Sequence, residues 1–103
     1  MSHIELTNLE LTALMAQDPS VVVVDVRTPH EFTGLGHIAG ATLLPLQKLQ
    51  ERVNELDPKS KIVLICQHGV RSMNATLWLE QQGFTRLYNL THGMSEWDGP
   101  TIK

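Results

Sequence analysis

The chain has 103 residues, of which 42% are hydrophobic and 18% are charged. This length suits one compact domain with a single core, so we predict a single domain over residues 1–103. Its 11 acidic residues outnumber the 8 Lys and Arg, which gives a net charge of −3. A chain of this charge lacks the broad basic surface that nucleic acid or an anionic membrane would require, so neither partner is expected.

The first predicted element is a helix that begins after Thr7. Thr7 and Glu10 have the spacing of a capping box, in which each side chain accepts a hydrogen bond from the other residue's backbone. Leu6 and Leu11 are placed as the hydrophobic staple that accompanies such a box. The Asp18-Pro19 pair ends the helix, because proline disfavours a helical residue before it.

The next predicted element is a central strand. Residues 21–24 are four consecutive valines, the pattern of a strand buried on both faces, and Asp25 marks its carboxyl end. A second capping box follows, with Thr28 as the cap, Pro29 at the first helical position and Glu31 three residues after the cap. We therefore predict a short helix directly after this strand.

The remaining elements follow from apolar spacing and from glycine and proline positions. A loop and short strand over 36–44 come first, followed by a helix marked by Leu46, Leu49, Val53 and Leu56. A strand over 61–65 comes next, and then a helix marked by Met73, Leu77 and Trp78 and closed by Gly83. The last elements are a strand over 86–90 and a final helical turn over 94–97. This alternation predicts an α/β fold, with a mostly parallel sheet of about five strands flanked by helices on both faces.

Cys66 is the single cysteine of the chain, and it stands where a strand passes through a short loop into a helix. Backbone N–H groups and the positive end of the helix dipole meet in such a loop and stabilise a thiolate. Gly69 leaves room for a bound anion, and Arg71 adds a permanent positive charge. Since ligands of parallel sheets bind at the carboxyl ends of the strands, residues 25–27 and 66–72 should open onto one crevice.

Five segments, in this order, make the chain similar to a single-domain rhodanese, a sulfurtransferase. They are Asp25-Val26-Arg27, Glu31-Phe32, Gly36-His37-Ile38-Ala39-Gly40-Ala41, Cys66-Gln67-His68-Gly69-Val70-Arg71-Ser72 and Gly93-Met94-Ser95-Glu96-Trp97. Together they span most of the chain. The chain departs from the family pattern at His92, where a paired glycine is usual, and in the short segment after Trp97.

The resemblance implies a transferase that moves sulfur in two steps. Cys66 would be the catalytic nucleophile, taking sulfur from a donor such as thiosulfate, holding it as a persulfide and passing it to cyanide or a thiol. The acceptor or donor could equally be a protein sulfur carrier. The resemblance implies a monomer that needs no metal and no organic cofactor.

The loop would bind substrate and persulfide through the backbone N–H groups of residues 67–72. Arg71 is expected to contact substrate, whereas Arg27 is expected to form an internal ion pair with Glu31 or Asp25. Accessory roles are also assigned to Asp25 as a buried hydrogen-bond acceptor and to His37 as a residue that fixes loop geometry. For His68 there are two alternative predictions: its charged form stabilises the Cys66 thiolate, or its side chain points to solvent. The expected loop residues are Gln67, His68, Gly69, Val70, Arg71 and Ser72.

Two other functions are weighed against sulfur transfer. Cysteine-dependent phosphatases and arsenate reductases also use a cysteine loop ending in arginine, but with five residues between the two, whereas four separate Cys66 from Arg71 here. A non-catalytic or redox-sensing binding module is the other alternative, since a reactive cysteine is also readily oxidised.

A cytoplasmic location is expected from two sequence features. One cysteine cannot form an intramolecular disulfide, which fits a reducing compartment. The amino-terminal segment Met1-Ser2-His3-Ile4-Glu5 has neither the basic stretch nor the apolar stretch of a secretory signal.

Overall fold

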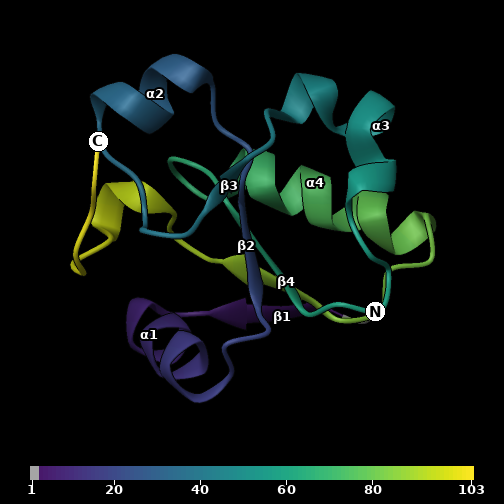
Figure 1. Ribbon diagram of the computed structural model, residues 1–103, viewed down its shortest axis with the longest axis horizontal. Helices are drawn as coiled ribbons and strands as arrows, with labels where there is room; N and C mark the ends of the chain where they lie inside the picture. The colour runs from purple at the N-terminus through teal and green to yellow at the C-terminus, as the bar shows by residue number, and fades with distance from the viewer. Residues whose placement is uncertain (1–2) are drawn as a thin grey trace.

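Figure 1 shows the computed structural model, which describes residues 3–103. The expectation drawn from Met1 and Ser2 lies outside these residues. In the described chain, five parallel strands form one sheet in the order β1-β5-β4-β2-β3. The strands are β1 (His3–Leu6), β2 (Val22–Asp25), β3 (Thr42–Leu43), β4 (Ile62–Ile65) and β5 (Leu87–Leu90). The predicted α/β class is confirmed.

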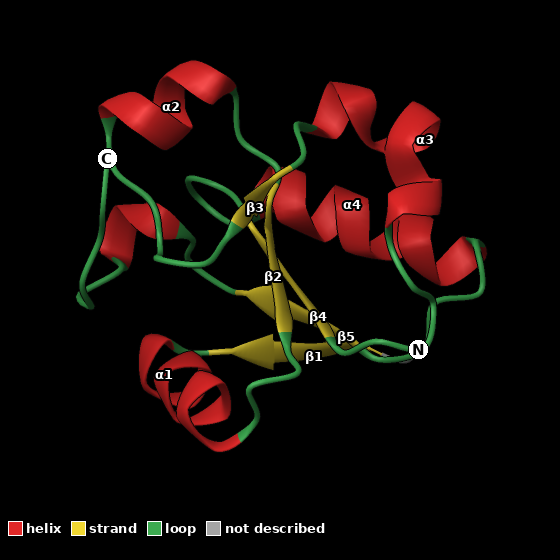
Figure 2. Cartoon of the chain, in the orientation of Figure 1, coloured by secondary structure: helices red, strands yellow, loops and turns green. Residues whose placement is uncertain are grey.

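Helices cover both faces of this sheet, as Figure 2 shows in red. The α-helices are α1 (Asn8–Gln17), α2 (Pro29–Gly34), α3 (Leu49–Arg52) and α4 (Val70–Gln81), and the single-turn 3₁₀ helices are η1 (Leu46–Lys48), η2 (Val53–Glu55) and η3 (Met94–Glu96). One core cluster packs β2, β4 and β5 against α3 and α4, and the other packs the opposite face against α1 and η3. None of the helices in residues 3–103 has the length and apolar character needed to cross a bilayer.

Both predicted capping boxes are present. In α1 the backbone N–H of Thr7 donates to Glu10 at 2.9 Å, and the N–H of Glu10 donates to the Thr7 hydroxyl at 3.1 Å. In α2 the corresponding bonds between Thr28 and Glu31 measure 3.0 and 3.2 Å. These bonds satisfy N–H groups that a helix start otherwise leaves without a partner.

Two elements differ from the predicted ones. The helix expected over Leu46 to Leu56 is divided into η1, α3 and η2. The apolar residues at its two ends, Leu46 with Leu49 and Val53 with Leu56, are three positions apart, which matches the three-residue turn of a 3₁₀ helix. The first strand, β1, has no counterpart among the predicted elements, because only Leu6 of its four residues is buried.

Helix α4 forms where predicted, but it presents a different face to the core. Its buried residues are Ser72, Ala75, Thr76 and Leu79. Leu77, one of the residues that marked the helix, is 39% exposed. Gly83 closes the helix with φ of +94°, and the N–H of Phe84 bonds back to the Leu79 carbonyl at 3.1 Å.

We predict that Leu79→Ala lowers the free energy of unfolding by about 2–5 kcal/mol, because the lost side chain leaves a cavity in the core. Leu77→Ala on the same helix is the matched control and should cost less than about 1 kcal/mol. Urea unfolding of both variants measures the difference. Equal losses would contradict the assignment of the buried face of α4.

Candidate active site

Cys66 follows β4 directly, at the carboxyl edge of the sheet, and its thiol is enclosed by its own loop. The residue is only 1% exposed. The N–H of Gly69 donates to the sulfur at 3.0 Å, and the S–H donates to the Ser72 hydroxyl at 3.2 Å. That hydroxyl donates in turn to the Gly69 carbonyl at 3.2 Å. When the thiol loses its proton, the hydroxyl can rotate and donate to the sulfur instead.

The start of α4 lies beside this sulfur without a side-chain cap. Gly69 is the N-cap residue, with φ of +99°, and no side chain in the described residues accepts a hydrogen bond from its first turn. The first N–H groups of a helix have no partner within the helix, and its dipole is positive at this end. Helices α1 and α2 are both capped. The uncapped end therefore leaves N–H groups of residues 70–72 available to an anion bound near Cys66.

The cysteine loop is fixed by the segment that joins β5 to η3. The N–H of Met94 donates to the Cys66 carbonyl, and the N–H of Ser95 donates to the Gln67 carbonyl, both at 2.8 Å. Gly93 permits this contact, because a Cβ there would lie 2.5 Å from the Cys66 carbonyl oxygen. Every positive φ angle among the described residues belongs to a glycine, so His92 occupies its position with ordinary backbone angles.

Arg27 is an internal residue, with its whole side chain buried. It forms an ion pair with Asp25 at 2.9 Å, which answers the choice that the sequence left between Asp25 and Glu31. Its other donors reach the Gln67 side chain at 2.9 Å and the Gly36 carbonyl at 2.8 Å. Arg27 thus links β2, the cysteine loop and the segment after α2.

Arg71 is held by Glu31 of α2 through two parallel hydrogen bonds of 2.8 Å each. The side chains are 36% and 24% exposed, respectively. The guanidinium, together with hydrogen bonds from Thr28, lowers the pKa of Glu31 from its ordinary 4.5 to about 2. The expected substrate contact therefore already has an anionic partner.

A small cavity of about 150 Å³ lies at the carboxyl end of β2. Its lining residues are Val26, Thr28, Pro29, Pro45, Leu46, Gln47 and Arg71. Arg71, which lines the cavity, belongs to the cysteine loop, so the cavity lies beside this loop. The structure thus brings Val26 and Arg71 to the wall of one cavity, whereas Asp25 and Arg27 are buried and do not line it.

The two histidines assigned to the site have different surroundings. His37 stacks on the Phe32 ring with centroids 3.6 Å apart, and its Nδ1 donates to the Phe32 carbonyl at 2.9 Å. Its backbone pairs with Ile102 through bonds of 2.7 and 2.8 Å, so the segment after Trp97 returns to α2. Figure 1 shows the carboxyl terminus there. His68 is exposed at the loop surface.

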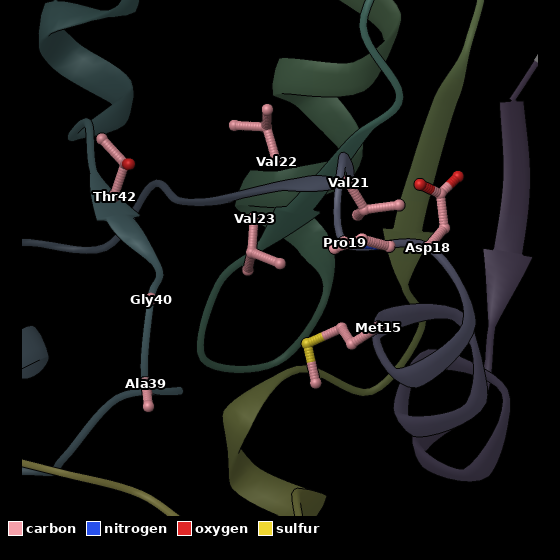
Figure 3. A pocket seen from close by; sticks show the side chains of 9 residues that line it. All are labelled: Met15, Asp18, Pro19, Val21, Val22, Val23, Ala39, Gly40 and Thr42. Carbon is pink, nitrogen blue, oxygen red and sulfur yellow. The ribbon is translucent and has the colours of Figure 1, made fainter.

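A second cavity, of about 420 Å³, is shown in Figure 3. It is lined by Met15, Asp18, Pro19, Val21, Val22, Val23, Ala39, Gly40 and Thr42. Its carboxylate, Asp18, forms an ion pair with Lys61 at 2.6 Å. This cavity lies beside the amino-terminal part of β2, at the other end of the strand from the cysteine loop, so it is separate from the candidate site.

Two features of the site were missed in the sequence: the Glu31–Arg71 pair and the support from Met94 and Ser95. The sequence does contain one signal for the Glu31–Arg71 pair. Glu31 and Arg71 each lie in the first turn of a helix that follows a strand, and β2 and β4 are neighbours in the sheet. A strand order predicted together with these helix starts would have placed the two side chains close together.

Comparison with known proteins adds independent findings. The rhodanese-like domain family matches residues 7–99. The chain is 44% identical over 77 residues to the uncharacterized protein YqhL of Bacillus subtilis, covering 75% of this chain and 60% of that protein. It is 34% identical over 97 residues to the thiosulfate sulfurtransferase GlpE of Shewanella oneidensis, covering 94% of this chain and 95% of that protein. The solved structure of a rhodanese-like domain protein from Staphylococcus aureus superposes on this chain with a TM-score of 0.86 at 31% identity, covering 100% of this chain and 99% of that one.

We predict that Gly69→Ala disrupts the cysteine loop, because the new Cβ would lie 2.0 Å from the Thr91 carbonyl oxygen. Gly83→Ala is the control: it has a similar positive φ of +94° but open space around the new atom. The control should cost only the left-handed backbone penalty of about 1–2 kcal/mol. Urea unfolding should show a clearly larger loss for Gly69→Ala, and equal losses would contradict the close contact.

The Glu31–Arg71 pair predicts a stability change in acid. The pKa of Glu31 is about 2 in the folded protein against an ordinary 4.5, so its stabilisation is complete above pH 4.5 and is lost as the pH falls toward 2. Since both side chains are partly exposed, screening reduces the contribution to about 1 kcal/mol. Unfolding of wild type and Glu31→Gln should differ by this amount at pH 6 and converge near pH 2. A constant difference would show that another interaction is responsible.

Proposed function

The chain belongs to the rhodanese-like domain family, and from this premise we propose that it is a sulfurtransferase that carries sulfur as a persulfide on Cys66. The observation that carries the proposal is the position of the sulfur, bonded by the Gly69 N–H and beside the uncapped start of α4. A thiolate and a persulfide anion are both stabilised by such donors. The chain spans only 60% of the length of YqhL. The activity of a longer protein that contains this chain is therefore also a matter of proposal.

In the first step, the Cys66 thiolate attacks the outer sulfur of a donor such as thiosulfate. A bond forms between Sγ and that sulfur while the S–S bond of thiosulfate breaks. The electron pair of the broken bond leaves with sulfite, and the total charge does not change. An unperturbed cysteine is only a few per cent ionised at neutral pH, so the donors around the sulfur make attack possible by favouring the thiolate.

In the second step, the outer sulfur of the Cys66 persulfide is transferred to a nucleophile such as cyanide or a thiol. Cyanide attacks the outer sulfur, the S–S bond breaks, and its electron pair returns to Sγ, which restores the thiolate. The Ser72 hydroxyl and the N–H groups of residues 69–72 are assigned to stabilising the charge on sulfur in both steps. His37 and the Asp25–Arg27 pair are assigned to positioning the loop.

Substrate reaches the sulfur, on this proposal, through the cavity that Val26 and Arg71 line. Burial of the thiol does not separate sulfur transfer from redox sensing, because a reagent must reach Cys66 in both cases. The spacing of four residues between Cys66 and Arg71 gives little support to a phosphatase. We propose a single domain that acts as a monomer in the cytoplasm on small sulfur donors and acceptors or on a protein sulfur carrier.

We predict that thiosulfate adds one sulfur atom to the wild-type protein and none to Cys66→Ser, because serine cannot form a persulfide. Intact mass spectrometry before and after cyanide addition is the measurement, and cyanide should remove the added sulfur. Titration of the thiol beforehand shows that Cys66 is reduced and accessible. No added sulfur on such a protein would rule out thiosulfate as the donor, and a gain in Cys66→Ser would place the sulfur elsewhere.

A further inference from the structure

Arg71 is the cationic side chain of the cysteine loop, yet its charge is already balanced. Both of its terminal nitrogens bond the Glu31 carboxylate at 2.8 Å. This contact is the largest cause of the raised pKa of Arg71, and the charges of Cys66 and Asp25 are smaller causes. The guanidinium is thus within electrostatic range of the catalytic sulfur but remains bound to a carboxylate.

The other ion pair near the sulfur is neutral as well. Arg27 is fully buried against Asp25, so it offers no net charge to a substrate. A thiolate that meets the thiosulfate dianion brings three negative charges together, and they are opposed by the backbone N–H groups of the loop and the Ser72 hydroxyl, which carry no net charge. A neutral or singly charged donor avoids most of this repulsion, which is strong where water is partly excluded.

We propose that Glu31 determines donor specificity: by neutralising Arg71 it keeps the entrance of the site uncharged and favours a persulfide R–S–SH over the thiosulfate dianion. The proposal rests on the sulfurtransferase function and names its donor class. The Cys66 thiolate attacks the terminal sulfur of R–S–SH, the Sγ–S bond forms, and the donor's S–S bond breaks. The electron pair leaves on R–S⁻, and the proton stays on the transferred sulfur.

The small cavity beside Arg71 supports the same donor class. Its wall includes the apolar side chains of Val26, Pro29, Pro45 and Leu46. A persulfide has a carbon group that can occupy such a wall, whereas thiosulfate consists only of sulfur and charged oxygen. Apolar surface and a neutralised cation together therefore suit an organic donor.

Glu31→Gln tests the proposal because glutamine keeps an oxygen for the Thr28 N–H and so preserves the capping box. Glu10→Gln is the matched control. Glu10 occupies the same position in the capping box of α1, where it bonds the Thr7 N–H, and no guanidinium in the described chain bonds it. Both variants lose one negative charge at a capped helix start, but only one frees Arg71.

Initial rates are measured with thiosulfate and with 2-hydroxyethyl persulfide, whose carbon group is uncharged, as donors, at fixed cyanide. We expect Glu31→Gln to lower the KM for thiosulfate by about fivefold or more, with little change in kcat, and to change the KM for the persulfide by less than about twofold. Glu10→Gln should change neither. An unchanged preference in Glu31→Gln, or poorer use of thiosulfate, would overturn the proposal.

Sulfite binding gives a readout that does not depend on turnover. Titration with sulfite, followed through the ¹⁵N NMR signal of the Arg71 side chain, should give a dissociation constant about fivefold lower for Glu31→Gln than for wild type or Glu10→Gln. Equal affinities would overturn the role of Glu31 even if sulfur transfer occurs. If no variant accepts sulfur from either donor while sulfite binding changes as expected, the sulfurtransferase function fails and the charge effect of Glu31 stands.

Discussion

Arg27 imposes the constraint that organises the carboxyl edge of the sheet. A guanidinium with no exposed surface must find all its partners inside the protein, because an uncompensated buried charge costs about 3–5 kcal/mol. Its partners are Asp25 on β2, the Gln67 side chain in the cysteine loop and the Gly36 carbonyl after α2. Three segments that are distant in sequence are therefore held in one arrangement, and Cys66 stands next to one of them.

The two arginines of the site have separate roles that their sequence positions do not reveal. Each follows a buried strand, and each was expected near substrate or near an acidic partner. Burial separates them: Arg27 has no contact with solvent, whereas Arg71 is 36% exposed and pairs with a carboxylate on a different helix. The first holds the cysteine loop through its bond to Gln67, and the second is paired with Glu31 at the start of α4.

Local signals in the sequence predicted much of the fold. The two capping boxes, the valine run before Asp25 and the glycine that closes α4 depend on neighbours within a few residues, so the chain itself carries the information. The position of Cys66 between a strand and a helix start could be inferred in the same way. These local features explain why the fold class and the cysteine loop can be predicted from the sequence.

Long-range contacts explain what was missed. Strand β1 is an edge strand held by its pairing with β5, and its sequence lacks an apolar run because most of its side chains are exposed. The contacts of Met94 and Ser95 with the loop are backbone bonds, which leave no mark on residue type except at Gly93. The Glu31–Arg71 pair joins residues 40 positions apart, and only the order of the strands brings them together.

The helix starts show how stability is distributed around the site. Helices α1 and α2 each have a complete capping box, whereas α4, the helix behind Cys66, has none. A missing cap costs a helix about 1 kcal/mol, and a glycine at the cap position reduces that cost only partly. The same omission leaves the first N–H groups of α4 without a side-chain acceptor, next to Gly69, whose own N–H bonds the sulfur. Glu31 takes part in both arrangements. It completes the capping box of α2, and it neutralises Arg71 in the first turn of α4. One carboxylate therefore links the stability of α2 to the charge at the start of α4.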